Sequence, residues 1–206
     1  MISNQETKKE QIIFAAMNLF AKKGFAKTSM ADIAIEAGIG KGTTYEYFKG
    51  KDQLFFATFQ WFVEQSEKDA DLSFKELAPK NGSDKIRVFS KSILNSIKES
   101  EEFYPLVLEF WAATSSSVYR DKMKQSFKDL YKRIGDILVA IIKEGVENNE
   151  FDPGIDIDSV VPGIVGAWDA IGLQAWFYDG PDDGFNMEKT MKSFTDLIIR
   201  GLLKKK

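Results

Sequence analysis

The sequence predicts an all-α protein, and three observations indicate this fold class. Apolar residues recur at helical spacing along almost every segment of the 206-residue chain. No stretch alternates apolar and polar residues for long enough to indicate a strand, and glycine-containing breaks separate the helical segments. We expect about nine helices, in a small three-helix domain over residues 1–50 and a larger helical domain over residues 51–206.

The first two helices carry clear start and stop signals. Residues 10–24, EQIIFAAMNLFAKKG, form an apolar stripe that includes Phe20, and Gly24 is placed to end the helix. The second helix follows Ser29, with Asp32 three residues later. That spacing is the capping box, in which the hydroxyl accepts from a backbone N–H and the carboxylate reaches back. Gly38 is placed to end this helix.

A tight turn then leads into a third helix over about residues 41–48, which predicts a helix-turn-helix. Gly38 supplies the positive-φ corner of the turn, and Ile39 is its apolar residue. Lys41, at the start of the third helix, can reach a phosphate or a guanine edge. Tyr45 and Tyr47 flank this helix and can donate hydrogen bonds to phosphates. The segment is therefore interpreted as a probe for the DNA major groove.

The larger domain begins with a long helix that runs from about residue 51 toward residue 66, with an extension past that residue left open. Further helices are predicted near residues 84–99, 103–113, 117–149, 158–178 and 186–204. The breaks between them are APKNGSD at 78–84, NNEFDPGIDID at 148–158 and YDGPDDG at 178–184. Asp158 is expected to cap the helix that follows the second break, and neither acidic break has the spacing of a calcium loop.

Composition argues against most enzyme classes. The chain has no Cys and no His, so Ser-His-Asp and Cys-His sites are excluded and a zinc site is disfavoured. Carboxylate, Lys or Tyr chemistry stays open. We expect no metal and no cofactor.

No apolar run is long enough to span a membrane, and the polar N-terminus lacks a signal-peptide core, so a cytoplasmic location is expected.

Charge is distributed unevenly along the chain. Residues 1–51 contain 8 Lys and 5 Asp or Glu, a net charge of +3, although the whole chain carries −3. A basic N-terminal segment followed by an acidic remainder of the chain suits local contact with phosphates. Ordinary charge fluctuation explains the same numbers about equally well.

Residues 19–55, LFAKKGFAKTSMADIAIEAGIGKGTTYEYFKGKDQLF, resemble the DNA-binding region of the TetR (tetracycline-repressor) family of bacterial transcriptional regulators. The resemblance covers about the first quarter of the chain. It implies DNA-contacting residues of two kinds. Those nearest the bases would be Gly40, Lys41, Gly42 and Thr43, and those on the phosphates would include Thr28, Tyr45, Tyr47 and Lys51, with Ser29 counted among the DNA-binding residues.

Two positions depart from the family pattern. Gly40 stands where many members have Ser, so the third helix loses a side-chain cap. Thr44 stands where a bulky aliphatic residue is common, so this helix is expected to be anchored less firmly.

The larger domain is rich in aromatic residues, and most of them are explained by core packing. Several can instead line an apolar ligand cavity, as sensor domains of the resembled family do. The segment EFWAATSSS at 109–117 mixes a carboxylate, aromatics and hydroxyls in a way that suits a cavity wall. The candidate ligand-binding residues are Phe62, Phe103, Glu109, Phe110, Trp111, Trp168 and Trp176. A small apolar or aromatic ligand is expected.

Residues 162–177, PGIVGAWDAIGLQAWF, are apolar on nearly every face, which predicts burial on all sides. The resemblance implies a homodimer through the last two helices. The sequence is thus interpreted as a ligand-responsive DNA-binding regulator, most simply a repressor released from a palindromic operator. The alternatives are a helical carrier or interaction protein that has lost DNA binding and, less favoured, a carboxylate- or Lys-based enzyme.

Overall fold

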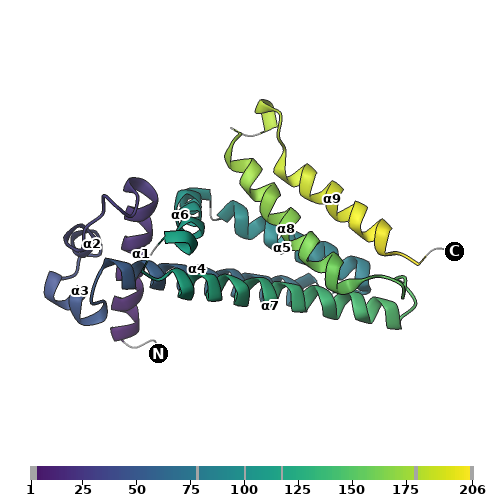
Figure 1. Cartoon of the computed structure of the whole chain (residues 1–206), viewed down its shortest axis with the longest axis horizontal. Coiled ribbons are helices and arrows are strands. Elements are labelled where there is room, and N and C mark those ends of the chain that lie inside the picture. The colour runs from purple at the N-terminus through teal and green to yellow at the C-terminus, as the bar shows by residue number, and fades with distance from the viewer. Residues whose placement is uncertain (1–3, 78, 100, 117, 179–180, 205–206) are drawn as a thin grey trace. The chain divides into compact units, whose positions relative to one another are not determined.

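The computed structural model describes residues 4–77, 79–99, 101–116, 118–178 and 181–204 (Figure 1). These ranges contain nine α-helices and no strand, which confirms the predicted all-α class. The helices are α1 Asn4–Lys23, α2 Met30–Glu36, α3 Lys41–Tyr47, α4 Lys51–Leu77, α5 Gly82–Glu99, α6 Tyr104–Ser116, α7 Arg120–Glu147, α8 Ile157–Trp176 and α9 Met187–Leu202. Within the same ranges, no helix has both the length and the hydropathy needed to cross a bilayer.

The chain packs as two compact units. Unit 1 consists of Met1–Gln65 and Ser100–Phe127, and unit 2 consists of Ser66–Glu99 and Lys128–Lys206. Packing therefore places α6 in the same unit as the three N-terminal helices. The functional boundary at residue 50 stays a prediction, since packing and function need not divide a chain at the same point.

In unit 1, α1 packs against α2 and α6, and α2 packs against α3. The apolar stripe of α1 is buried, with Ile12 and Ala16 at 0% exposure. Phe20, from the same stripe, begins a chain of aromatic contacts. Its ring centroid lies 5.7 Å from that of Phe55 in α4, and Phe55 lies 5.0 Å from Phe110 in α6. The α1 stripe thus forms a core shared with α4 and α6.

In unit 2, α5 and α8 both pack against α9. Trp168 of α8 is 1% exposed and meets Phe89 of α5 edge to face, with ring centroids 5.8 Å apart. Ser90 and Thr195 form a buried hydrogen bond of 2.6 Å between α5 and α9. This polar pair fixes the register of two otherwise apolar helix faces, because an unpaired hydroxyl there would be costly.

Glu150, in the connection between α7 and α8, ties that connection to the start of α5. Its carboxylate accepts from the backbone N–H groups of Gly82 and Ser83, at 2.7 and 2.9 Å. Burial alone would raise the pKa of Glu150. The hydrogen bonds from Ser83 and Gly82 outweigh that effect and leave its pKa below the usual value.

One predicted detail, the cap of α8, needs correction, and one open question, the length of α4, is answered. The helix that begins at Ile157 is capped by Asp156, whose side chain accepts from the backbone N–H of Ser159, so the expected cap Asp158 was wrong. Asp158 lies in the first turn of α8 instead. The long helix α4 also continues well beyond residue 66, to Leu77.

Candidate DNA interface and ligand-binding residues

Both predicted glycine corners are present in the structure. Gly24 ends α1 with a φ of 80°, and Gly38 follows α2 with a φ of 64°. These backbone angles lie in the left-handed region, which residues other than glycine rarely adopt because their Cβ atom clashes with the backbone. The capping box of α2 also forms. Asp32 N–H donates to the Ser29 hydroxyl over 3.1 Å, and Ser29 N–H donates to the Asp32 carboxylate over 2.9 Å.

Two buried residues of the α3 segment anchor it to unit 1. Thr44 is 0% exposed, and Phe48, the residue that ends the helix, is 3% exposed. The Thr44 hydroxyl donates to the Gly40 carbonyl over 3.2 Å, so this small residue is fully packed and bonded. As expected, Gly40 begins α3 without a side-chain cap.

The opposite face of α3 is open to solvent. Lys41, Gly42, Tyr45 and Glu46 are exposed, while Thr43 and Tyr47 are half-buried. An added Cβ at Gly40 or Gly42 would meet no atom within 4 Å, so both backbone positions are accessible to a large partner. Of the four residues predicted nearest the bases, Gly40, Lys41 and Gly42 are therefore exposed, and Thr43 is exposed only in part.

Two other predicted DNA-binding side chains are already engaged within unit 1. Thr28 is 2% exposed, and its hydroxyl donates to the carbonyls of Gly24 and Leu19 at 2.9 and 3.3 Å. Its hydroxyl proton is thus used internally. The Ser29 hydroxyl donates to Asp32, and the hydrogen bonds from Ser29 lower the pKa of that carboxyl. Both residues act locally on the α1–α2 turn.

Lys51, a predicted phosphate contact, binds the same turn. Its ammonium donates to the Phe25 carbonyl over 2.7 Å and to the Ala26 carbonyl over 3.3 Å. It also lies 4.4 Å from the centroid of the Phe25 ring, a cation–π distance. Lys51 therefore stabilises the turn between the first two helices, whatever else it contacts.

Glu109 holds that turn from the other side. Both carboxylate oxygens of this α6 residue accept from the Phe25 backbone N–H, at 3.0 and 2.9 Å. The Phe25 backbone is thus bonded by a carboxylate at its N–H and by an ammonium at its carbonyl. We call Gly24, Phe25 and Ala26, with Glu109 and Lys51, the Phe25 corner. Sequence reasoning missed it, because no local pattern links residues 84 positions apart.

The other predicted ligand-binding residues fall into both packing units. Phe110 is 1% exposed, with its ring 5.0 and 5.2 Å from Phe55 and Phe59, so it fills the core of unit 1. The rings of Phe103 and Phe14 meet edge to face, with their centroids 6.3 Å apart. Trp111 is 41% exposed, and its ring centroid lies 6.4 Å from that of Phe127.

Phe62 is half-buried, also in unit 1. In unit 2, Trp168 belongs to the hydrophobic core and Trp176 is 42% exposed. The indole Nε1–H of Trp168 has no hydrogen-bond partner among the described residues. The ligand-binding role of the seven residues stays a prediction. Across the described ranges, no three acidic side chains gather as metal ligands.

Two family models match the chain. One, described as "Bacterial regulatory proteins, tetR family", matches residues 12–58, and the other, "Tetracyclin repressor-like, C-terminal domain", matches residues 85–184. A fatty acid metabolism regulator protein of Bacillus subtilis is 26% identical over 197 residues, which cover 93% of this chain and 94% of that protein. These similar proteins are regulators of transcription and not enzymes.

Solved structures share the fold. The fatty acid degradation regulator FadR from Bacillus halodurans aligns with a TM-score of 0.72 at 19% identity, over 93% of this chain and 94% of that chain. A putative transcriptional regulator from Saccharomonospora viridis, in complex with choline, aligns with a TM-score of 0.74 at 16% identity, over 98% and 100% of the two chains.

The Phe25 corner generates a stability prediction. Glu109→Ala leaves the Phe25 N–H without its acceptor, and a hydrogen bond to a charged group contributes about 1.5–3 kcal/mol. We expect a melting temperature lower by roughly 3–10 °C and faster amide exchange at Phe25. Glu109→Gln keeps an acceptor oxygen and should recover most of the loss. Glu102→Ala, at an exposed site in the same unit, serves as the control. Unchanged exchange at Phe25 in Glu109→Ala would show that the contact is dispensable.

Proposed function

Since the chain belongs to the TetR family of bacterial transcriptional regulators, we propose that it is a cytoplasmic, ligand-responsive repressor that binds a palindromic operator as a homodimer. Each protomer inserts α3 into one major groove. The two half-sites then lie about one helical turn apart, or a multiple of it, at ~34–36 Å. The observation that carries this proposal is the anchored α3 with its open outer face.

The chemistry of that face suits DNA. Tyr45 is 39% exposed, and its hydroxyl, together with that of Tyr47, can donate to phosphates on the two walls of a groove. Lys41 stands at the N-terminal end of α3, beside two glycines that let the duplex approach the backbone. Lys41 and Thr43 therefore supply the groups closest to the base edges. We leave Thr28 out of the proposed contact set, because its hydroxyl is buried and bonded.

The last two helices carry an uncovered surface that supports the homodimer. On α8 the exposed residues Gly163, Gly166 and Ala170 recur at three- and four-residue spacing, so they share one helix face. On α9, Leu197 is 58% exposed and Gly201 follows four residues later on the same side. Small residues allow another helix to come close, and an exposed leucine gains free energy when it is covered. Two such helices from each protomer would form a four-helix bundle.

The proposed effector is a small apolar or aromatic molecule. The name of the Bacillus subtilis relative links that protein to fatty acid metabolism, so fatty acids are the first compounds to try. The Saccharomonospora viridis structure supports small-molecule binding by a protein of this fold. An effector releases the repressor only by binding one conformation more tightly than the other. Within unit 1, the half-buried Phe62 and the exposed Trp111 are the proposed contacts, since neither is fully buried in the core.

DNA contact by α3 is tested with Lys41→Ala. Removing a cation from the proposed interface should weaken binding to a selected operator duplex by roughly 10- to 100-fold, from about 1–3 kcal/mol per lost contact. If Lys41 contacts phosphates, the slope of log K against log salt also falls by about 0.9 per protomer. Fluorescence anisotropy across a salt series measures both effects.

Lys189→Ala is the matched control, since this exposed lysine of α9 lies in the other packing unit and should not change DNA affinity. Lys51→Ala is less informative, because it also removes two hydrogen bonds of the Phe25 corner. Equal affinity of Lys41→Ala and wild type would remove α3 from the interface.

The homodimer is tested with Leu197→Glu. A buried, unpaired carboxylate is strongly unfavourable, so this variant should elute as a monomer in size-exclusion chromatography with light scattering. Val118→Glu is the control, because Val118 is 84% exposed and belongs to unit 1, whereas α8 and α9 belong to unit 2. A Leu197→Glu variant as dimeric as the control would place the dimer contact elsewhere.

A further inference from the structure

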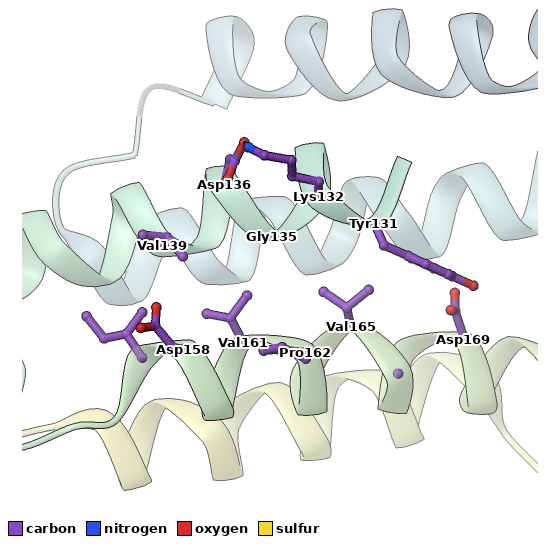
Figure 2. A pocket seen from close by; sticks show the side chains of 12 residues that line it. Tyr131, Lys132, Gly135, Asp136, Val139, Asp158, Val161, Pro162, Val165 and Asp169 are labelled. Atoms are coloured by element: carbon purple, nitrogen blue, oxygen red, sulfur yellow. The ribbon is translucent and has the colours of Figure 1, made fainter. Parts of the chain in front are cut away.

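A groove in unit 2 contains none of the residues assigned above to a ligand, and it shares one residue, Gly166, with the proposed dimer face of α8. It runs between α7 and α8 and has a volume of about 540 Å³ (Figure 2). Sites for small molecules in proteins range over roughly 300–1,000 Å³. Both helices belong to the same packing unit along this stretch, so all the lining residues lie in unit 2.

The middle of the groove is apolar. Val161 and Val165 project from α8, with Val139 facing them from α7 (Figure 2). Gly135 of α7 adds no side chain, and a Cβ placed there would already contact Val161 at 3.5 Å. The centre therefore suits a hydrocarbon or an aromatic ring and offers it few hydrogen bonds.

The charges at the edge of the groove are mostly negative. The lining residues include three carboxylates, those of Asp136, Asp158 and Asp169, and one cation, that of Lys132. The Lys132 ammonium lies 2.6 Å from the Asp136 carboxylate, four residues away on the same helix, so these two charges compensate each other. Within the described part of the chain, Asp158 and Asp169 have no cationic partner.

Asp169 is the better placed of the two remaining carboxylates. It sits at one end of the groove, where the Tyr131 side chain points toward it and donates a hydrogen bond (Figure 2). Burial raises the pKa of Asp169, and the Tyr131 hydrogen bond opposes that rise only in part. The charged carboxylate is therefore poorly compensated by the protein. Asp158 lies eleven residues earlier on α8, about 16 Å away along the helix.

These observations distinguish three classes of ligand. An anion would be repelled by the two uncompensated carboxylates. A neutral apolar molecule would fill the centre but would remove water from Asp169 without replacing it, which is unfavourable. A compound with an apolar body and one ammonium group fills the centre and also supplies the missing positive charge.

We propose that the groove between α7 and α8 binds a small hydrophobic amine, with its ring or chain on Val161 and Val165 and its ammonium group paired with Asp169. This site is separate from the aromatic residues proposed for the effector, and its occupation does not require DNA binding. The Tyr131 ring stands beside the bound ammonium and keeps the Asp169 carboxylate oriented toward it.

The test compares three compounds that share one body and differ in charge: 4-phenylbutylamine, 4-phenylbutanol and 4-phenylbutanoate. Isothermal titration calorimetry with the full chain measures each affinity. We expect the amine to bind at least about tenfold more tightly than the alcohol and the acid to bind more weakly than both. In Asp169→Asn, which preserves shape, the preference for the amine over the alcohol should fall to about threefold or less.

Two further variants keep the test decisive. Glu147→Gln removes an exposed carboxylate of α7 that does not line the groove, and it should leave the preference unchanged. If Asp169→Asn fails to fold, Asp169→Ser substitutes for it, since it also removes the carboxylate and should reduce the preference as far.

Equal binding of amine and alcohol by the wild type would overturn the proposal, as would a preference that survives the aspartate substitutions. If no compound binds and Asp169→Asn instead changes the dimer dissociation constant, the groove is covered by a second copy of the chain and the proposal is wrong.

Discussion

The Phe25 corner is the constraint on which the candidate DNA interface depends. A turn between two helices leaves backbone groups that need partners. Here the Phe25 N–H donates to Glu109 and its carbonyl accepts from Lys51. The Phe25 ring also packs 4.8 Å from Phe55. The first three helices are thus held by α4 and α6 as well as by their own core, so α3 is presented by a larger body than residues 1–50 alone.

Support from α4 and α6 explains why α3 can expose so much of its surface. The helix is short, and it buries Thr44 together with the following Phe48. Its outer face carries the lysine, glycines and tyrosine that we propose as DNA contacts, so anchoring and proposed contact use opposite sides of the helix. At position 44 the small threonine side chain is fully buried, and its hydroxyl donates to the Gly40 carbonyl.

Local signals were sufficient to predict much of this structure, whereas tertiary contacts were not. Gly24, Gly38 and the Ser29–Asp32 cap were predictable because each acts on its own backbone within a few residues. The role of Glu109 was not, because its partner lies far away in sequence and a carboxylate beside aromatics also fits a cavity wall. For Phe110, the sequence could not separate a core position from a cavity position, because aromatic residues of both kinds recur at the same helical spacing. Asp156 and Asp158 illustrate a finer limit, because either could cap α8 on sequence grounds.

We propose that α3 reads duplex DNA and that a homodimer formed by α8 and α9 presents two copies of α3. Selection of duplexes from a random library by the purified full chain measures this most directly, since it returns the site, its symmetry and its spacing together. We expect an inverted repeat whose half-site centres lie about one helical turn apart, or a multiple of it. Enrichment of no sequence over random competitor, or of a single half-site without a symmetric mate, would contradict it.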